Sequence, residues 1–149
     1  MKQIKLYRVS FSPGYGDMLG GYHESTLKKD KDGSWIYVCS DRETHDRPTV
    51  TTVYSVSDAA VCQLEEFIKS NKVLSLEERP KSDMFMTDYS PWSWSIDYDT
   101  TSLGKPKREY CSFGEYKRYS ALDYELLREL EKRFAALQGE KISETAGDF

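Results

Sequence analysis

The sequence predicts an α+β fold, in which one antiparallel sheet of about six strands has both helices packed on one face. Three observations support this fold class. Several segments alternate apolar and polar residues with the period of two that is typical of strands. Two segments carry apolar residues at helical spacing, and short connections join consecutive strands. The expected order is ββββ-α-ββ-α, in a single domain of residues 1–139 followed by a disordered acidic tail of residues 140–149.

The first part of the chain predicts an antiparallel meander of four strands. We expect these strands at residues 4–12, 22–29, 34–40 and 49–56. The first has apolar residues on both faces, which favours an interior place in the sheet. The glycine-rich residues 13–21 match neither a P-loop nor a dinucleotide-binding fingerprint. We interpret them as a wide hairpin loop, with an anion-binding backbone cradle as the less favoured alternative. The Asp-Gly pair at the end of residues 30–33 is typical of a tight hairpin turn.

The first predicted helix follows the meander. Ser57 is a suitable N-cap, and Asp58 lies beside the positive end of the helix dipole. Residues 60–68 place their apolar side chains along one stripe, and Asn71 is a plausible C-terminal stop. Residues 73–88 contain a proline that would end any helix before it, so we predict a mostly irregular segment there.

The second predicted helix covers residues 120–138 and has the clearest pattern in the chain. Ser120 caps it, and Asp123 occupies the capping-box position. Its apolar stripe consists of Leu126, Leu127, Leu130, Phe134 and Leu137. We expect Gly139 to stop the helix, because glycine is common just after a C-terminus.

A β-hairpin at residues 91–113 precedes this helix and contains two of the three tryptophans. Its first strand alternates large apolar residues with small polar ones. One face carries Trp92, Trp94, Ile96 and Tyr98, and the other carries Ser93, Ser95, Asp97 and Asp99. The return strand is expected at residues 107–113. The aromatic face is either a platform that stacks on sugars or bases, or the core beneath a helix. We favour the core, because large aromatic residues are highly buried on average.

This hairpin and helix support one family resemblance. The matching positions are Ser93, Trp94, Ser95, Ile96, Tyr98, Asp99 and the helical residues 126–137. In this order they resemble small uncharacterised bacterial α+β domains, in which an alternating serine and aromatic strand precedes a second strand and a closing leucine-rich helix. The sequence departs from that pattern at residues 113–116, where a small-residue turn and a proline are expected. The resemblance covers about a third of the chain and implies the fold only.

Composition limits the function classes. The formal net charge is −4, of which the last ten residues contribute −2 and residues 1–139 the other −2. This balance favours neither nucleic acid nor an anionic membrane as a partner. The N-terminus lacks the apolar region of a signal peptide and no apolar run reaches membrane-spanning length, so we expect a cytoplasmic protein. Cys39, Cys62 and Cys111 are far apart in the sequence, and we expect them to be reduced.

The sequence contains few candidates for metal binding or catalysis, and we expect no metal and no cofactor. Asp97 and Asp99, with Asp83 and Asp88 upstream, are oxygen ligands for a hard cation, but one flat strand cannot surround an ion. Pairing with basic residues of the return strand is the simpler interpretation. His23 and Glu24 lack the second histidine of a zinc protease motif. His45 and Asp46 read as part of a polar loop rather than as a catalytic pair.

Three hypotheses for function remain open. The leading one is a non-catalytic protein-interaction or accessory module, because tyrosines on an open sheet face suit a protein partner. The second is single-stranded nucleic-acid binding through residues 105–119, where basic residues alternate with Tyr110, Phe113, Tyr116 and Tyr119. The third is an enzyme whose site is assembled from residues dispersed along the sequence.

Overall fold

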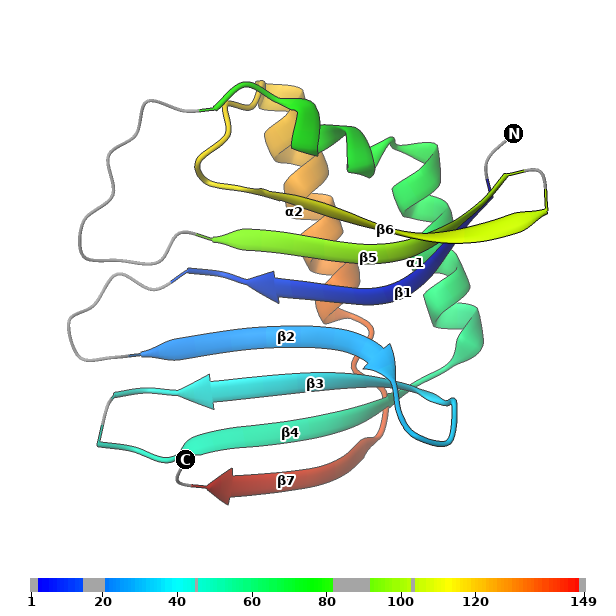
Figure 1. The fold of residues 1–149 in the computed structure, drawn as a ribbon. Helices are drawn as coiled ribbons and strands as arrows, with labels where there is room; N and C mark the ends of the chain where they lie inside the picture. Colours follow the sequence, from blue (N-terminus) through cyan, green and yellow to red (C-terminus); the bar gives the residue numbers. More distant parts are fainter. Residues whose placement is uncertain (1–2, 15–20, 45, 82–91, 103, 148–149) are drawn as a thin grey trace.

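The computed structural model describes residues 3–14, 21–44, 46–81, 92–102 and 104–147. Within these residues the chain forms one sheet and three helical segments (Figure 1). The strands are β1 (Gln3–Ser12), β2 (Tyr22–Lys29), β3 (Trp35–Arg42), β4 (Thr49–Val56), β5 (Ser93–Ser102), β6 (Lys105–Gly114) and β7 (Lys141–Gly147). The helices are α1 (Asp58–Ser70), the 3-10 helix η1 (Val73–Glu78) and α2 (Ala121–Ala135).

The strands lie in the order β6-β5-β1-β2-β3-β4-β7, and every neighbouring pair is antiparallel. This arrangement confirms the predicted antiparallel α+β fold and corrects the strand count from about six to seven. The β5–β6 hairpin pairs with β1 instead of continuing the meander from β4. The segment that holds α1 and η1 crosses behind the sheet to reach β5, and α1 and α2 cover the same face (Figure 1).

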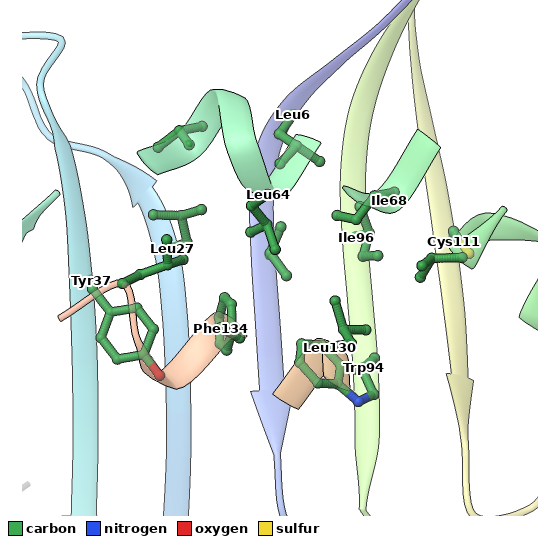
Figure 2. Close-up of a cluster of buried hydrophobic side chains, with 14 of the residues drawn as sticks. Leu6, Leu27, Tyr37, Leu64, Ile68, Trp94, Ile96, Cys111, Leu130 and Phe134 are labelled. Atoms are coloured by element: carbon green, nitrogen blue, oxygen red, sulfur yellow. The ribbon is translucent and has the colours of Figure 1, made fainter. Parts of the chain in front are cut away.

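Cross-strand neighbours share a face of the sheet, so the strand register defines the helix-covered side. One row on that side consists of Ile96, Val9, Leu27 and Tyr37, which are paired in register and are all buried. Above this row α1 contributes Leu64 and Ile68, and α2 contributes Leu130 and Phe134 (Figure 2). The core therefore lies between the middle of the sheet and the two helices.

The tryptophans confirm the core interpretation of the central hairpin. Trp94 is 2% exposed and belongs to the main core cluster, while Trp92 is half-buried at its margin. Tyr98 is also half-buried against the core. The period-two pattern places these three side chains on the helix-covered face, as expected from the sequence.

The other face of the sheet is mixed, because small polar residues fill its middle while Tyr110 lies on it and is exposed. One register row across it consists of Ser112, Ser95, Ser10 and Thr26. Tyr37 and Tyr54 pair with each other on the helix-covered side instead. Strand parity decides this outcome, since it directs Tyr37 and Tyr54 toward the helices and Tyr110 toward the open face.

The helix starts are capped as predicted. The Ser57 hydroxyl accepts a hydrogen bond from the Ala60 N–H at 3.1 Å. Ser120 and Asp123 form a complete capping box at the start of α2. The carboxylate of Asp123 also accepts two hydrogen bonds from the Arg79 guanidinium, with an Nε–Oδ2 distance of 2.8 Å. This pair lowers the pKa of Asp123 and fastens the end of η1 to the start of α2.

Two segments differ from their sequence predictions. Residues predicted to be mostly irregular include η1, in which Val73 and Leu76 are buried. Their spacing of three matches the three residues per turn of a 3-10 helix, so both point into the core. The predicted disordered tail instead contains β7, which pairs along β4. All of β7 is exposed, so no buried apolar stripe marks it in the sequence.

Gly139 serves a different purpose from the predicted one. Helix α2 ends at Ala135 with Ala136 as its cap, so Gly139 lies beyond the helix stop. A Cβ atom at Gly139 would collide with the backbone carbonyl oxygen of Ser55. Glycine is therefore needed for the close approach of the chain to β4, where β7 begins.

Candidate functional site

A depression that could hold a ligand lies between α2 and the adjoining ends of β1 and β5. Its volume is about 470 Å³. Four aromatic residues, two aliphatic residues and two charged residues line it, namely Phe11, Trp92, Trp94, Tyr124, Pro13, Leu127, Arg128 and Glu131. We call it the α2 pocket. Its size lies within the range of about 300–1,000 Å³ that is usual for small-molecule sites.

Strand pairing forms the floor of the α2 pocket. Phe11 and Trp94 are register partners in β1 and β5, and their rings stack with a centroid distance of 4.3 Å. Behind them Phe134 meets Trp94 edge-on at 5.2 Å. These contacts hold the Trp94 ring in one orientation, so the floor is already formed in the absence of a ligand.

A second aromatic group forms the side of the α2 pocket. Tyr119 lies 5.8 Å from Trp92 and 5.5 Å from Tyr124, measured between ring centroids. The Tyr119 hydroxyl donates a hydrogen bond to the Gly114 carbonyl oxygen at 2.8 Å. Burial raises the pKa of Tyr119 far above the usual value of a tyrosine, so the hydroxyl stays neutral and keeps this bond.

Helix α2 supplies the wall with the charged groups. Tyr124, Leu127, Arg128 and Glu131 follow the i, i+3, i+4, i+7 spacing of one helical stripe. Arg128 and Glu131 are exposed, and neither forms an ion pair within the described part of the chain. The pocket therefore presents one guanidinium and one carboxylate at the edge of an aromatic cavity. A guanidinium suits planar anions, because its fork of N–H donors matches a carboxylate.

Only part of this site was expected from the sequence. Trp92 and Trp94 line the pocket, and the sequence predicted them as core residues. Tyr124, Arg128 and Glu131 were assigned no role. Their helical spacing was a usable signal, since it places an aromatic ring and two charges on one stripe beside the apolar one.

The predicted acidic cluster does not form a metal site in the described residues. Asp99 accepts a hydrogen bond from the Arg108 Nε at 2.5 Å, as the predicted cross-strand pairing requires. Asp97 lies on the open face, opposite Tyr110. Asp83 and Asp88 lie outside the described residues. No group of three potential metal ligands occurs among the residues that the structure describes.

Residues 105–119 are distributed over several surroundings and do not form one basic and aromatic surface. Arg108 and Tyr110 are exposed and occupy alternate positions of β6 on the open face. Phe113 is fully buried, and the Lys117 ammonium donates to the Glu77 carbonyl oxygen at 2.6 Å. Tyr119 packs against Trp92 and Tyr124, which line the α2 pocket. The nucleic-acid hypothesis assumed that these side chains act together, and the fold separates them.

The cysteines with shifted pKa values are not activated nucleophiles. Burial raises the pKa of Cys111 to about 12, and its thiol donates to the Leu74 carbonyl oxygen. Burial also raises the pKa of Cys39. Both thiols are therefore protonated at neutral pH. His23 pairs instead with Asp41, with an Nδ1–Oδ1 distance of 2.8 Å. His45 lies outside the described residues.

No protein-family model, curated protein or solved structure matches the chain. The resemblance of residues 93–138 to bacterial α+β domains therefore stays a prediction. Among the described helices, none is long and apolar enough to cross a membrane.

Proposed function

We propose that this protein is a non-catalytic binding module whose α2 pocket binds a small organic acid with an aromatic ring. The observation that carries the proposal is the combination of four aromatic residues with a guanidinium at the edge of one cavity. Offset-stacked and edge-to-face ring pairs contribute about 0.5–1.5 kcal/mol each beyond their buried area. The described lining holds no histidine, cysteine or lysine, which favours binding over chemistry.

The charges at the edge of the pocket also suggest a preference among acids. Arg128 pairs with one acidic group of the ligand, while Glu131 lies one helical turn further along the same stripe. A second negative charge on the ligand would be repelled by Glu131. We therefore expect aromatic monocarboxylates and monosulfonates to bind better than aromatic diacids.

The first prediction is that 8-anilinonaphthalene-1-sulfonate binds the native protein saturably at one site. Trp92 and Trp94 line the pocket, so excitation of tryptophan should transfer energy to the bound dye. The Arg128→Gln variant should weaken the affinity about tenfold, because a hydrogen bond to a charged group contributes about 1.5–3 kcal/mol. Fluorescence titration measures both effects, and 2-naphthoate should displace the dye.

Lys132→Gln is the matched control for this charge removal. Lys132 is exposed on the same helix and does not line the pocket. Its loss should leave the affinity for the dye unchanged. Equal weakening by Arg128→Gln and Lys132→Gln would show general electrostatic attraction and contradict the proposal. Absence of saturable binding to protein with a native near-ultraviolet circular dichroism spectrum would also contradict it.

A second candidate function, protein interaction, is favoured by the state of the sheet edges. The β6 edge is partly covered by η1. The Glu77 carboxylate accepts a hydrogen bond from the Ser112 N–H at 3.2 Å, and the Leu74 carbonyl oxygen accepts one from the Cys111 thiol. Strand β7 at the opposite edge is exposed along its whole length, and among the described strands it pairs with β4 only (Figure 1). An open edge of this kind accepts a strand from another chain. In this proposal the partner is the β7 strand of a second copy.

Light scattering over a range of concentrations tests the self-association, and the expected result is a rise from monomer to dimer mass. The variants Glu144→Pro and Thr145→Pro form a matched pair, because adjacent strand residues direct their N–H groups to opposite sides. One of them should abolish the dimer and keep the fold, while the other should disturb the pairing with β4. A mass that stays monomeric at every concentration would contradict this function and leave the proposal for the α2 pocket unaffected.

A further inference from the structure

The open face of the sheet carries a second depression, directly behind the floor of the α2 pocket. Its volume is about 290 Å³, and its base consists of four serines on two adjacent strands. Ser10 pairs in register with Ser95, and Ser12 pairs with Ser93. We call this depression the serine trough. The same alternation that directs Trp92 and Trp94 toward α2 directs Ser93 and Ser95 into the trough.

The serine trough is a hollow because its base consists of small serines while the side chains around it are larger. Arg8, Asp97 and Tyr110 form one row along the register of β1, β5 and β6. The Tyr110 side chain is 60% exposed, which is unusual for a large aromatic residue and leaves its ring accessible. Glu24 of β2 lines the trough from another strand.

The neighbouring charged residues on this face are mostly engaged, whereas two that line the trough are not. The Arg108 guanidinium pairs with Asp99 and lies over the Tyr7 ring, 3.5 Å from its centroid. By contrast, the side chains of Arg8 and Asp97 form no hydrogen bond or ion pair with one another or with another described residue. Both side chains are therefore available to a ligand at this position.

The charge of the trough restricts the chemistry of that ligand. One guanidinium and two carboxylates surround it, so a polyanion would meet net repulsion. Ser10, Ser12 and Glu24 already form hydrogen bonds within the protein. An apolar ligand would still leave the Arg8 guanidinium and the Asp97 carboxylate without hydrogen-bonding partners. A hydroxyl group is both donor and acceptor, so it pairs equally well with a guanidinium, a carboxylate and a serine. An accessible tyrosine ring adds a flat surface whose negative π face attracts the C–H groups of a sugar ring.

We propose that the serine trough binds a neutral saccharide. One sugar ring lies against Tyr110, and its hydroxyl groups pair with Arg8 and Asp97. The adjoining sugar of the oligosaccharide lies over the serines of β1 and β5. This site is on the opposite face of the sheet from the α2 pocket, so the proposal does not depend on the one made for that pocket.

Isothermal titration calorimetry with the tetrasaccharides maltotetraose, cellotetraose and mannotetraose tests this proposal. At least one should bind, and Tyr110→Ala should weaken its affinity about tenfold, as expected for loss of a stacking ring and its contact area. Ser95→Val replaces a hydroxyl of the trough by two methyl groups, and valine suits a strand, so the fold should be kept. It should weaken binding about fivefold.

Two control variants separate the trough from other surfaces. Tyr124→Ala removes an aromatic residue of the α2 pocket and should leave saccharide binding unchanged. Ser143→Val makes the same change as Ser95→Val on β7, away from the trough, and should also have no effect. The proposal is overturned if none of the three tetrasaccharides binds below about 10 mM. It is equally overturned if Tyr110→Ala binds like the wild type, or if only a heparin tetrasaccharide or oligothymidylate binds.

Discussion

The Phe134→Ala variant should lose about 3–5 kcal/mol of unfolding free energy, which is the usual cost of truncating a buried phenylalanine. Phe134 is 1% exposed and links α2 to two different strands. Its ring meets Tyr37 of β3 at 5.0 Å and Trp94 of β5 at 5.2 Å, both edge-on. Truncation therefore removes two ring contacts and leaves a cavity between the helix and the middle of the sheet (Figure 2).

Urea denaturation followed by far-ultraviolet circular dichroism measures this loss. Leu122→Ala is the matched control, because Leu122 lies on the same helix and is 76% exposed. Its unfolding free energy should stay within about 0.5 kcal/mol of the wild type. If Phe134→Ala does not fold, Phe134→Leu should show a smaller loss of about 1–2 kcal/mol. Equal effects of Phe134→Ala and Leu122→Ala would show that α2 is not packed as described.

The elements with a clear apolar pattern were predictable from the sequence. The stripe that includes Leu127, Leu130 and Phe134 specifies both the presence of α2 and the face that it buries. Alternation from Trp92 to Tyr98 likewise specifies β5 and the side on which its aromatic residues lie. In both segments, the local periodicity and the final burial favour the same conformation, so packing in the fold does not override the secondary structure that the pattern predicts.

The arrangement of these elements was less predictable. Strand β7 has no buried residue, so no apolar pattern distinguishes it from a disordered tail. The position of β5 beside β1 depends on how the segment of α1 and η1 crosses the sheet. Glu65 of α1 contributes to this arrangement, since its carboxylate accepts the Leu6 N–H at 2.9 Å beside the irregularity in β1. Such a contact over 59 positions leaves no local signal in the sequence.

The difference between local pattern and tertiary arrangement also explains how much of the two depressions could be predicted from the sequence. The composition of each face of β5 follows from its alternation, so Trp94 and Ser95 had to point in opposite directions. The α2 pocket also needs Arg128 and Tyr124 placed over the end of β5, and the serine trough needs Ser10 beside Ser95. Both requirements are tertiary pairings. The residue types were visible in the sequence, but their assembly into sites was not.

The second large effect is expected for Gly139→Ala, at the point where the chain leaves α2 and begins β7. The added Cβ would collide with the backbone carbonyl oxygen of Ser55. Because the colliding atom belongs to the backbone, no side-chain rotation can relieve the collision. Three hydrogen bonds join this stretch to Ser55, from the Gly139 N–H at 3.1 Å, from the Glu140 N–H at 3.2 Å, and from the Ser55 N–H to Glu140 at 2.8 Å. Forcing the backbones apart should destabilise the protein by about 1–3 kcal/mol.

Hydrogen exchange of the β4 amides distinguishes this local mechanism from a general loss of stability. In Gly139→Ala, the Ser55 amide and the β4 amides that pair with β7 should exchange much faster. The exchange rates of amides in β1 and β5 should change only as much as the loss of global stability requires. Gly147→Ala provides the control at the other end of β7, because nothing lies within 4 Å of its added Cβ. It should leave both exchange and stability nearly unchanged. If Gly139→Ala behaves like Gly147→Ala, then β7 does not begin against Ser55, and the β4 edge is free for another strand.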